Sequence, residues 1–397
     1  MVPLTATVIG AVVFWASLAA VTWTYAGYPL LLLALARRRR RSPHPPRPTE
    51  DPPFEPMVTI IVSAYNEEKA IRRKLERTLA LDYPPEKLEV IVASDSSTDR
   101  THDIVRELGP RGVRLVVLPE RAGKTAAQNQ AAAAAKGEVL IFTDATTELD
   151  RGSVRQLCAS FVDPRVGCVG AELEYVSEGG SAVGKGGGLY WRYEKRVKEL
   201  ESQVSTLIGV SGCLYAVRAN AYRPIEPDLI SDFVVAGDVF QRGFITVYGG
   251  GTVSSERTHE ETGREFEMRV RVIVRTINAL VRRARMLNPL RYGFFSFQLF
   301  SHKVLRYLVP ELLIAIFASG LYLALAGGSS APVYRAFLIA QLALYLAAAV
   351  GWLRQRLGLR LRFVHVPFYF VVVNLAALWA LMLYLRGERK VTWTTVR

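Results

Sequence analysis

Cysteine and histidine are scarce in this sequence of 397 residues, which holds only three cysteines and five histidines. The cysteines, Cys158, Cys168 and Cys213, lack the paired spacing of a metal or redox site, and a reduced cytosolic environment suits them. The histidines are scattered, so the sequence shows no zinc cluster. Neither a GxxxxGKS/T loop nor a GxGxxG motif after a strand is present, which argues against these two kinds of phosphate-binding protein.

Charged side chains are also sparse, at 22% of residues against 50% hydrophobic, and the mean hydropathy of +0.16 indicates that part of the chain lies in lipid. The formal net charge of +14 could indicate nucleic-acid binding. However, much of the arginine flanks long apolar runs, where positive residues are expected beside membrane spans. We therefore predict membrane lipids as a partner, and no nucleic acid.

The first 36 residues carry no charge at all, and an unbroken arginine run, Arg37 to Arg41, follows them. This stretch exceeds the roughly 20 residues that cross a bilayer. A secretory signal would have a basic start, a shorter apolar core and a cleavage site, so we predict an uncleaved transmembrane anchor over residues 1–41. The arginines place its carboxyl end in the cytoplasm. The proline-rich stretch 42–56 is predicted to be a stiff, extended linker.

The last part of the chain, residues 289–397, is predicted to be a transmembrane region with three apolar runs of near-spanning length, at 305–326, 333–353 and 363–385. The arginine-rich loop between the last two runs is predicted to be cytoplasmic, and the uncharged loop before it to lie outside. Three crossings would leave the basic tail, Arg386 to Arg397, outside, in conflict with its charge. A re-entrant or tilted last segment would remove this conflict. The chain is thus predicted to be a multi-pass protein of the cell inner (plasma) membrane.

Residues 57–288 are predicted to form a cytoplasmic α/β domain, because strands alternate with helices as in a mostly parallel sheet. The predicted strands are 58–63, 89–93, 114–118 and 139–143, and the predicted helices are 67–79, 100–108, 124–135, 190–201 and 232–242. Asn66 is available to cap the first helix, and Thr147 with Asp150 to cap a helix after the fourth strand. The glycine-rich stretch 179–188 is predicted to be a mobile loop, and the basic amphipathic helix 265–287 to lie on the inner membrane surface.

Acidic residues end two of these strands, since Asp95 follows strand 89–93 and Asp144 follows strand 139–143. The carboxyl ends of parallel strands share one edge of a sheet, so the two carboxylates together indicate a nucleotide-and-metal site. Asp144 would there hold a divalent cation against a phosphate, although by itself it is equally well explained as a turn residue. The residues after the first strand, Tyr65 to Glu68, reach the same edge, and one of them is a candidate for contacting a nucleoside.

Lys124 lies in an electrostatically poor position for a lysine. A cation in the first helical turn opposes the helix dipole, and the preceding Gly123 leaves backbone N–H groups approachable. Both features suit a docked diphosphate. The alternative is an ordinary exposed lysine.

Taken in order, the motifs of this domain resemble those of the inverting family 2 glycosyltransferases, which have a GT-A nucleotide-sugar-binding fold. The resemblance covers roughly residues 58–275, and the flanking apolar runs are similar to those of the membrane-embedded synthase branch. The motifs that carry it are Tyr65-Asn66-Glu67-Glu68, Asp95-Ser96-Ser97-Thr98-Asp99, Gly123-Lys124, Asp144-Ala145-Thr146, Tyr190-Trp191-Arg192-Tyr193-Glu194, Gly212-Cys213-Leu214-Tyr215-Ala216-Val217-Arg218 and Ser231-Asp232, with Gly243 beyond.

The resemblance implies a hexosyltransferase that moves a sugar from a nucleotide diphosphate sugar, with a UDP-sugar favoured, to a lipid-linked or glycan acceptor, as in polysaccharide biosynthesis. Asp232 would be the general base that deprotonates the acceptor, and Asp144 would ligate Mg²⁺ or Mn²⁺ at the diphosphate. On the substrate, Asp95 would bind the base, Glu67 would lie near the ribose and Lys124 near the diphosphate. Arg269 and Arg271 would neutralise the leaving group, although a surface helix also explains these arginines. Tyr65 and Gly212 complete the predicted substrate-binding residues.

Several positions depart from the family pattern. Thr146 stands where the metal motif has a second acidic residue, and Ser231 precedes the base in place of an acid. Met268 and Val272 replace the Gln and Trp of the QxxRW signature of processive synthases. Two alternatives therefore stay open: a processive polysaccharide synthase that also translocates its product, and an inactive nucleotide-sugar-binding scaffold subunit.

Overall fold

The computed structural model describes residues 4–39, 54–176, 182–257, 262–357, 359 and 364–389. Its strands are β1 (Val58–Ala64), β2 (Leu88–Ser94), β3 (Val113–Val117), β4 (Val139–Asp144), β5 (Glu148–Leu149), β6 (Val166–Val176), β7 (Leu214–Arg218) and β8 (Ile245–Arg257). The helices of the sheet domain are α3 (Ile71–Leu79), α4 (Thr101–Glu107), α5 (Lys124–Ala134), α6 (Ser153–Ala159), α7 (Ala182–Val204), α8 (Ser231–Gln241) and α9 (Thr262–Arg282). The remaining helical segments are α1 (Leu4–Thr22), η1 (Trp23–Gly27), α2 (Tyr28–Arg39), α10 (Pro289–Tyr292), α11 (Phe294–Leu299), η7 (Phe300–Val304), α12 (Leu305–Tyr307), α13 (Val309–Ala326), α14 (Ala331–Arg356) and α15 (His365–Leu385).

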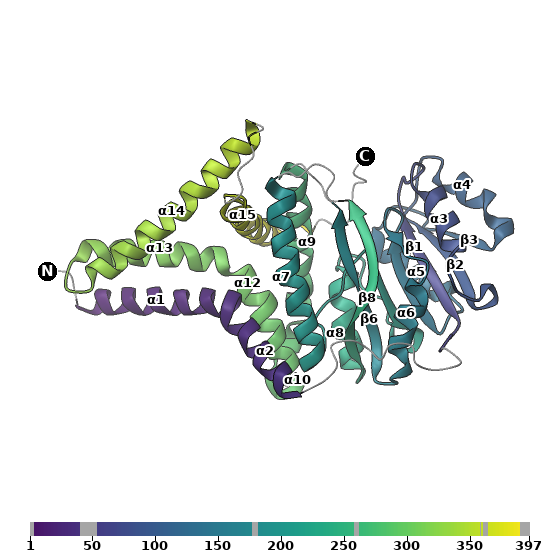
Figure 1. Ribbon diagram of the computed structural model, residues 1–397, viewed down its shortest axis with the longest axis horizontal. Coiled ribbons are helices and arrows are strands. Elements are labelled where there is room, and N and C mark those ends of the chain that lie inside the picture. Colours follow the sequence, from purple (N-terminus) through teal and green to yellow (C-terminus); the bar gives the residue numbers. More distant parts are fainter. Residues whose placement is uncertain are drawn as a thin grey trace.

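One mixed sheet of eight strands, in the order β3-β2-β1-β4-β7-β6-β8-β5, forms the centre of the domain. The first four strands in this order pair in parallel, as predicted from their alternation with helices. Strand β7 then pairs antiparallel with both β4 and β6, and β8 returns parallel to β6. Helices cover both faces of the sheet (Figure 1), so the predicted α/β class is confirmed.

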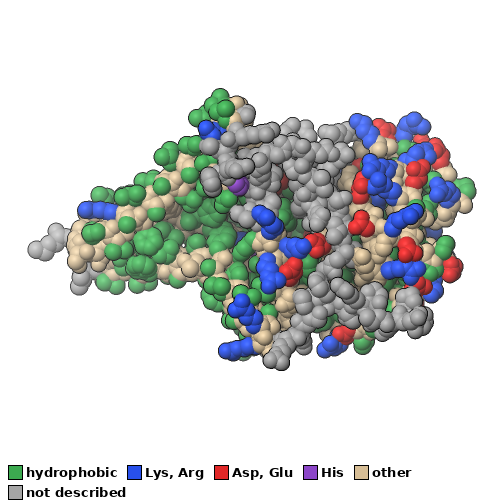
Figure 2. Space-filling view, viewed as in Figure 1, with side chains coloured by type: hydrophobic (Ala, Val, Ile, Leu, Met, Phe, Trp, Pro, Cys, Tyr) green, Lys and Arg blue, Asp and Glu red, His purple; other side chains and the backbone are tan. Residues whose placement is uncertain are grey.

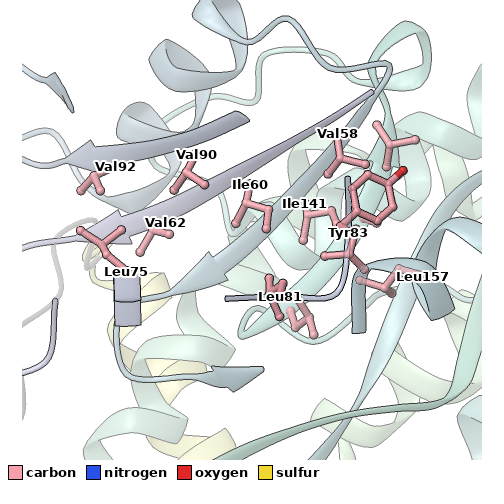
Figure 3. Close-up of a cluster of buried hydrophobic side chains, with 14 of the residues drawn as sticks. Val58, Ile60, Val62, Leu75, Leu81, Tyr83, Val90, Val92, Ile141 and Leu157 are labelled. Carbon is pink, nitrogen blue, oxygen red and sulfur yellow. The ribbon is translucent and has the colours of Figure 1, made fainter. Parts of the chain in front are cut away.

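The buried strand residues explain why the parallel part forms at the predicted places. All seven residues of β1 are buried, as expected for a strand covered on both faces. On one face, alternate residues of β1 and β2 pack with Leu75 of α3 and Leu157 of α6 in a single apolar cluster (Figure 3). On the other face, Ile61, Ile91 and Phe142 pack against α5 and α8. Helix α5 is therefore fixed on this face of the sheet.

Two local predictions about helix starts and loops were wrong. Helix α3 begins at Ile71 rather than at residue 67, and Asn66 does not cap it, because Asn66 adopts a left-handed conformation with a φ of 54°. Its side chain instead accepts a hydrogen bond from the Thr98 N–H at 2.8 Å. The stretch predicted as the loop 179–188 is helical from Ala182 on, since α7 starts there; the preceding part of that loop lies outside the described residues.

The predicted cap of the helix after β4 was also wrong. Helix α6 begins at Ser153 with Gly152 as its N-cap residue. Thr147 lies before it and is buried at 1% exposure, where its backbone oxygen accepts a hydrogen bond from Lys74. Thr147 thus serves the loop that carries Asp144 rather than the helix.

In the part of the chain that the structure describes, four helical stretches are long and apolar enough to cross a membrane: 5–38, Val309–Ala326, Ala331–Arg356 and His365–Leu385. Helices α1 and α13 run side by side away from the sheet, and α14 returns beside α13 (Figure 1). Hydrophobic side chains cover this lobe, whereas Lys, Arg, Asp and Glu gather over the sheet domain (Figure 2). The proline-rich linker and the basic tail from residue 390 lie outside the described residues, except for residues 54–56 of the linker.

The end of the first stretch packs against α7 of the sheet domain through Tyr28 and Leu32. Helix α15 packs against the same domain through α9. Its residues Ala376, Ala377, Ala380 and Leu383 form one buried cluster with the apolar face of α9. Nearer its start, Phe368 and Val372 pack with Tyr190 of α7 and Phe266 of α9. The apolar face of α9, which was predicted to lie on the membrane surface, is thus covered by α15.

Gly137 lies two residues before β4, where the chain passes close to β1. A Cβ at this position would lie 2.4 Å from the Thr59 backbone nitrogen, and backbone cannot move aside cheaply. We expect Gly137→Ala to destabilise the domain by about 1–3 kcal/mol, the usual cost of overpacking. Thermal unfolding of the purified protein should show a lower melting temperature. Gly109→Ala is the matched control, because nothing lies within 4 Å of a Cβ there. Equal melting temperatures for the two variants would contradict this packing.

Candidate active site

The two predicted carboxylates lie at one edge of the sheet, on either side of β1. Ser63 of β1 pairs with Asp144 at the end of β4, and Ala64 pairs with Ser94, the residue before Asp95. Two strand spacings separate the two positions, which is roughly 10 Å. The structure therefore brings Asp95 and Asp144 to a common edge, as their positions after parallel strands predicted.

Asp95 is fully buried, and its two oxygens differ in their surroundings. Oδ1 accepts hydrogen bonds of 2.8 Å from the N–H groups of both Ala122 and Gly123, immediately before α5. Oδ2 accepts none and lies 3.8 Å from the Arg121 Nε. A buried carboxylate oxygen without a hydrogen bond is costly, so Oδ2 would accept one from a ligand that displaces Arg121.

Tyr65 and Arg121 lie beside this unsatisfied oxygen. The Arg121 guanidinium lies 3.9 Å from the centroid of the Tyr65 ring, in cation–π geometry. Glu67 lies on the next part of the same loop, where its N–H donates to the Thr101 hydroxyl at 2.8 Å. Backbone N–H groups of residues 66–68 thus bind side chains that follow β2, and these bonds hold the two loops together. The edge offers an aromatic ring, a guanidinium and a carboxylate oxygen, a combination that suits a planar nucleobase.

Lys124 is the first residue of α5, and its ammonium forms an ion pair with the Asp144 carboxylate. It also donates a 3.0 Å hydrogen bond to the Gly212 carbonyl oxygen. Burial alone would lower the pKa of Lys124, but Asp144, together with Cys213 and Asp232, raises it above its usual value. The lysine therefore stays charged at the start of α5, where the helix dipole also favours an anion.

Helix α5 also holds the loop that leads to Asp232. The Thr125 hydroxyl donates to the Leu229 carbonyl at 2.9 Å, and the Ser231 hydroxyl donates to the Gln128 side chain at 2.7 Å. Asn129 binds the same loop through the backbone of Ile225. Ser231, which replaces an acidic residue of the family pattern, is thus used to fix α8 against α5.

Asp232, the predicted base, lies in the first turn of α8 against Gly212. A Cβ on Gly212 would come within 2.7 Å of the Asp232 Oδ2, so a side chain there would push this carboxylate from its position. Burial raises the pKa of Asp232. Nearby positive charges lower it by a smaller amount, and they belong, in decreasing order of effect, to Lys124, Arg275, Lys303 and Lys198. A carboxylate whose pKa is shifted toward neutral is a better proton acceptor than an ordinary aspartate.

The two predicted arginines of α9 lie in different surroundings. Arg269 pairs with Glu265 at 2.7 Å and lies among the rings of Tyr190, Trp191 and Tyr369. Arg271 lies on the face of α9 toward the sheet edge, where burial lowers its pKa and the Asp144 charge raises it. Arg275, one turn further along α9, donates to the Leu229 carbonyl at 2.6 Å. Burial lowers the pKa of Arg275, and the negative charge of Asp232 opposes this shift.

Sequence reasoning missed two cations of this site. Arg275 was assigned to a surface helix, although its i, i+4 spacing from Arg271 places both on one helix face. Lys74 of α3 is buried, with 5% exposure. Its ammonium donates to the Thr143 hydroxyl at 3.0 Å and to the Thr147 carbonyl at 2.6 Å. Burial lowers the pKa of Lys74 to about 7, against the raising effect of Asp144. Its place on the apolar stripe of α3, between Ile71 and Leu75, was the available signal.

The side chains at this edge could bind a divalent cation only together with a phosphate group of a substrate. In the described part of the chain, no group of three or more His, Cys, Asp or Glu side chains is placed to hold a metal ion. Asp144 offers one carboxylate, with 26% of its side chain exposed, and already carries the Lys124 ammonium as a cation. Thr146 is exposed beside it. Mg²⁺ binds through one or two carboxylates plus substrate phosphates, so one carboxylate at this edge is compatible with such an ion.

Comparisons with known proteins agree with this geometry. Residues 59–223 match the family model "Glycosyl transferase family 2". The chain is 33% identical over 128 residues to "Probable glycosyltransferase YdaM" of Bacillus subtilis (strain 168), which covers 31% of this chain and 30% of that protein. It is 31% identical over 118 residues to "Beta-monoglucosyldiacylglycerol synthase" of Synechocystis sp. (strain ATCC 27184 / PCC 6803 / Kazusa), covering 29% of this chain and 25% of that protein. The matches thus span less than a third of these curated relatives.

Among solved structures, the fold is similar to "Mannosyltransferase PcManGT from Pyrobaculum calidifontis in complex with GDP-Man and Mn2+". The TM-score is 0.68 at 23% identity, over 92% of this chain and 99% of that chain. At this identity the likeness concerns the fold. The family resemblance and the GT-A type of fold predicted from the motifs are both confirmed.

The roles of the two Asp95 oxygens can be tested separately by substitution. Asp95→Asn keeps an acceptor for the Ala122 and Gly123 N–H groups but replaces the unsatisfied oxygen by an amide donor. We expect the affinity for a nucleotide diphosphate sugar to fall at least about 10-fold, the value of one hydrogen bond to a charged group, with a nearly unchanged melting temperature. Titration calorimetry and thermal unfolding measure the two quantities. Asp95→Ala, which removes both functions, should lower the melting temperature as well. Unchanged affinity in Asp95→Asn would contradict a base-binding role.

Proposed function

Since residues 59–223 form a glycosyl transferase family 2 domain, we propose that the protein is a membrane-bound inverting glycosyltransferase. It moves a sugar from a nucleotide diphosphate sugar to a lipid-linked or glycan acceptor at the cytoplasmic membrane face. The observation that carries the proposal is the position of α5, whose first turns contact Asp95, Asp144 and the loop of Asp232. Base, diphosphate and acceptor sites are thereby assembled around one helix start.

On the donor side, the Asp95 Oδ2 would bind the nucleobase beside Tyr65, and Glu67 would lie near the ribose. Lys124 and Arg271 would neutralise the diphosphate, and Arg275 lies on the same face of α9 as Arg271. Asp144 would hold Mg²⁺ or Mn²⁺, which when bound acts as a Lewis acid on the leaving diphosphate. Arg269 stays in the aromatic cluster and is assigned a structural part in joining α9, α7 and α15.

On the acceptor side, Asp232 would accept the proton of the attacking hydroxyl. The Asp232 carboxylate lies against Gly212, and the Gly212 carbonyl oxygen accepts a hydrogen bond from Lys124. The general base and the diphosphate site are therefore both next to Gly212. Attack from the face opposite the leaving group inverts the anomeric carbon. A base with a raised pKa requires transfer to slow as pH falls through that pKa, above the range of an ordinary aspartate.

A processive polysaccharide synthase is the second candidate. The apolar helices beside the site favour it, since they could guide a growing glycan, whereas Met268 and Val272 in place of the processive signature oppose it. Single-sugar products on a gel would support the first candidate, and long ladders the second.

The membrane arrangement follows from the packing of α15. We assign residues 1–41 as an anchor, 42–56 as a linker, 57–288 as the cytoplasmic domain and 289–397 as the membrane region. Because α15 lies along α9, which carries Arg271 and Arg275 to the site, α15 would run along the membrane surface or tilt into it rather than cross. Three crossings, by α1, α13 and α14, then keep the basic carboxyl end in the cytoplasm, in agreement with the positive-inside rule.

Two neutral substitutions separate donor binding from transfer. Asp144→Asn should abolish metal-dependent binding and turnover of the nucleotide sugar, because the cation loses its protein carboxylate. Asp232→Asn should retain donor binding but lower transfer by 10²-fold or more, the usual contribution of a general base. Release of nucleoside diphosphate from a panel of nucleotide sugars measures turnover. Binding without any turnover by the unmodified protein would instead favour the inactive scaffold.

The position of the carboxyl end can be tested with reporters. Alkaline phosphatase fused after Arg397 should be inactive and green fluorescent protein fluorescent, because a cytoplasmic end supports only the second reporter. The same reporters placed in the loop at residues 327–330, between α13 and α14, should give the opposite result and serve as the control. An active phosphatase at the carboxyl end would mean that α15 crosses the membrane.

A further inference from the structure

Lys74 is a buried cation beside the candidate active site that has no part in the proposed binding of donor or acceptor. It shares the buried side of α3 with Ile71, Leu75 and Thr78, and only 5% of it is exposed. Burying an ammonium group is costly unless it is hydrogen-bonded, whereas a leucine or methionine would be buried there without that cost. A lysine at this position is therefore explained only by the contacts that its ammonium makes.

The Lys74 ammonium binds both ends of the turn that carries Asp144. It donates to the Thr143 hydroxyl, immediately before Asp144, at 3.0 Å, and to the Thr147 carbonyl oxygen, three residues after it, at 2.6 Å. Within the turn, the Thr147 N–H donates to the Asp144 carbonyl oxygen at 3.3 Å. Thr143 and Thr147 are both buried, so Lys74 holds the turn from its buried side. The Asp144 side chain, 26% exposed, stays on the accessible side.

Strand pairing supports Asp144 from one side only. Ser63 of β1 pairs with Asp144, and this is the last pair between β1 and β4. On the other side of β4, the pairing with β7 already ends at Thr143, which lies opposite Leu214. The backbone of Asp144 therefore leaves the sheet on the β7 side, and the contacts of Lys74 with the two flanking residues supply a second support.

Helix α3 is a firm base for these contacts. Its start is fixed by the Ile71 N–H, which donates to the Glu67 carbonyl oxygen at 2.9 Å, and Ile71 itself lies in the buried cluster of the sheet. On the outer side of the helix, Arg73 and Arg77 both pair with Glu148, just after the turn. These exposed ion pairs contribute little to stability, whereas the bonds of the buried lysine are shielded from water.

We propose that Lys74 is a positioning residue, which holds the Asp144 carboxylate in place for the divalent cation of the donor complex. This inference rests on the proposed function, and it gives Lys74 no contact with the nucleotide sugar. Lys124 cannot take this part, because it pairs with the same carboxylate that the cation would need. Lys74 instead binds the hydroxyl and carbonyl groups on either side of Asp144, so its contacts are compatible with a bound ion.

The test measures Mn²⁺ binding by the full-length protein in a non-ionic detergent, with UDP or GDP and without an acceptor. Electron paramagnetic resonance of free Mn²⁺ gives the dissociation constant. Lys74→Met keeps the length of the side chain but cannot donate a hydrogen bond. We expect the Mn²⁺ dissociation constant to rise about 10-fold or more, the usual effect of losing a group that orients a metal ligand. Binding of uridine or guanosine, which carry no phosphate, should be unchanged when measured by ligand-detected NMR.

Two further variants separate positioning from a general loosening of α3. Thr78→Val is the matched control, because Thr78 is buried one turn further along α3 and donates only to the Lys74 carbonyl oxygen, at 2.8 Å. It should lower the melting temperature but leave Mn²⁺ binding unchanged. Thr143→Val removes one acceptor of the Lys74 ammonium and should also weaken Mn²⁺ binding. Combined with Lys74→Met it should add nothing further, since both substitutions break the same contact.

Several outcomes would overturn this role of Lys74. They are unchanged Mn²⁺ binding in Lys74→Met, an equal loss in Thr78→Val, additive effects of Lys74→Met and Thr143→Val, and no nucleotide-dependent Mn²⁺ binding by the unmodified protein. If Lys74→Met does not fold, Thr143→Val decides, and unchanged Mn²⁺ binding in that variant refutes the role. The proposed function is decided separately, by release of nucleoside diphosphate from a nucleotide sugar. Mn²⁺ binding that depends on Lys74 without any turnover would leave the positioning role standing and refute the transferase.

Discussion

The bonds between Asp95 and the start of α5 are the constraint on which the whole carboxyl edge depends. One oxygen of this buried carboxylate accepts the N–H groups of both Ala122 and Gly123 and thereby fixes where α5 begins. From that point the helix places Lys124 on Asp144, and Thr125 and Gln128 on the loop before Asp232. Groups that are far apart along the chain are thus held around one helix start. This structural use of Asp95 leaves its second oxygen without a hydrogen bond.

Electrostatic balance divides the site into two parts. Around Asp144, cations come from three elements: Lys74 from α3, Lys124 from α5 and Arg271 from α9. Around Asp232, the cations are Lys124 of α5 and Arg275 of α9, followed by Lys303 of η7 and Lys198 of α7. Such an excess of partly desolvated cations is unfavourable in an isolated protein, and bound anions offset it. In the proposed function, a donor diphosphate would offset the charge of the first group.

The apolar helices take part in the site as well as in membrane attachment. The π-helical segment η7 continues into α12 and α13, and its His302 connects to Glu194 and Glu201 of the sheet domain. Helix α15 covers the apolar face of α9, whose other face carries Arg271 and Arg275. The membrane region therefore fixes the side of the site where an acceptor would arrive, and the sheet fixes the side where a donor would bind.

The sequence by itself determined the α/β class, the parallel strands and the apolar stretches, because these follow from local hydrophobic periodicity and run length. It also placed Asp95 and Asp144 at one edge, since the carboxyl ends of parallel strands must meet there. Only the tertiary structure decided which arginine of α9 faces the site, that Lys74 and Lys303 contribute charge, and that α15 lies on the domain. These facts depend on how helices distant in sequence pack and turn against one another, and no local pattern of residues records that packing.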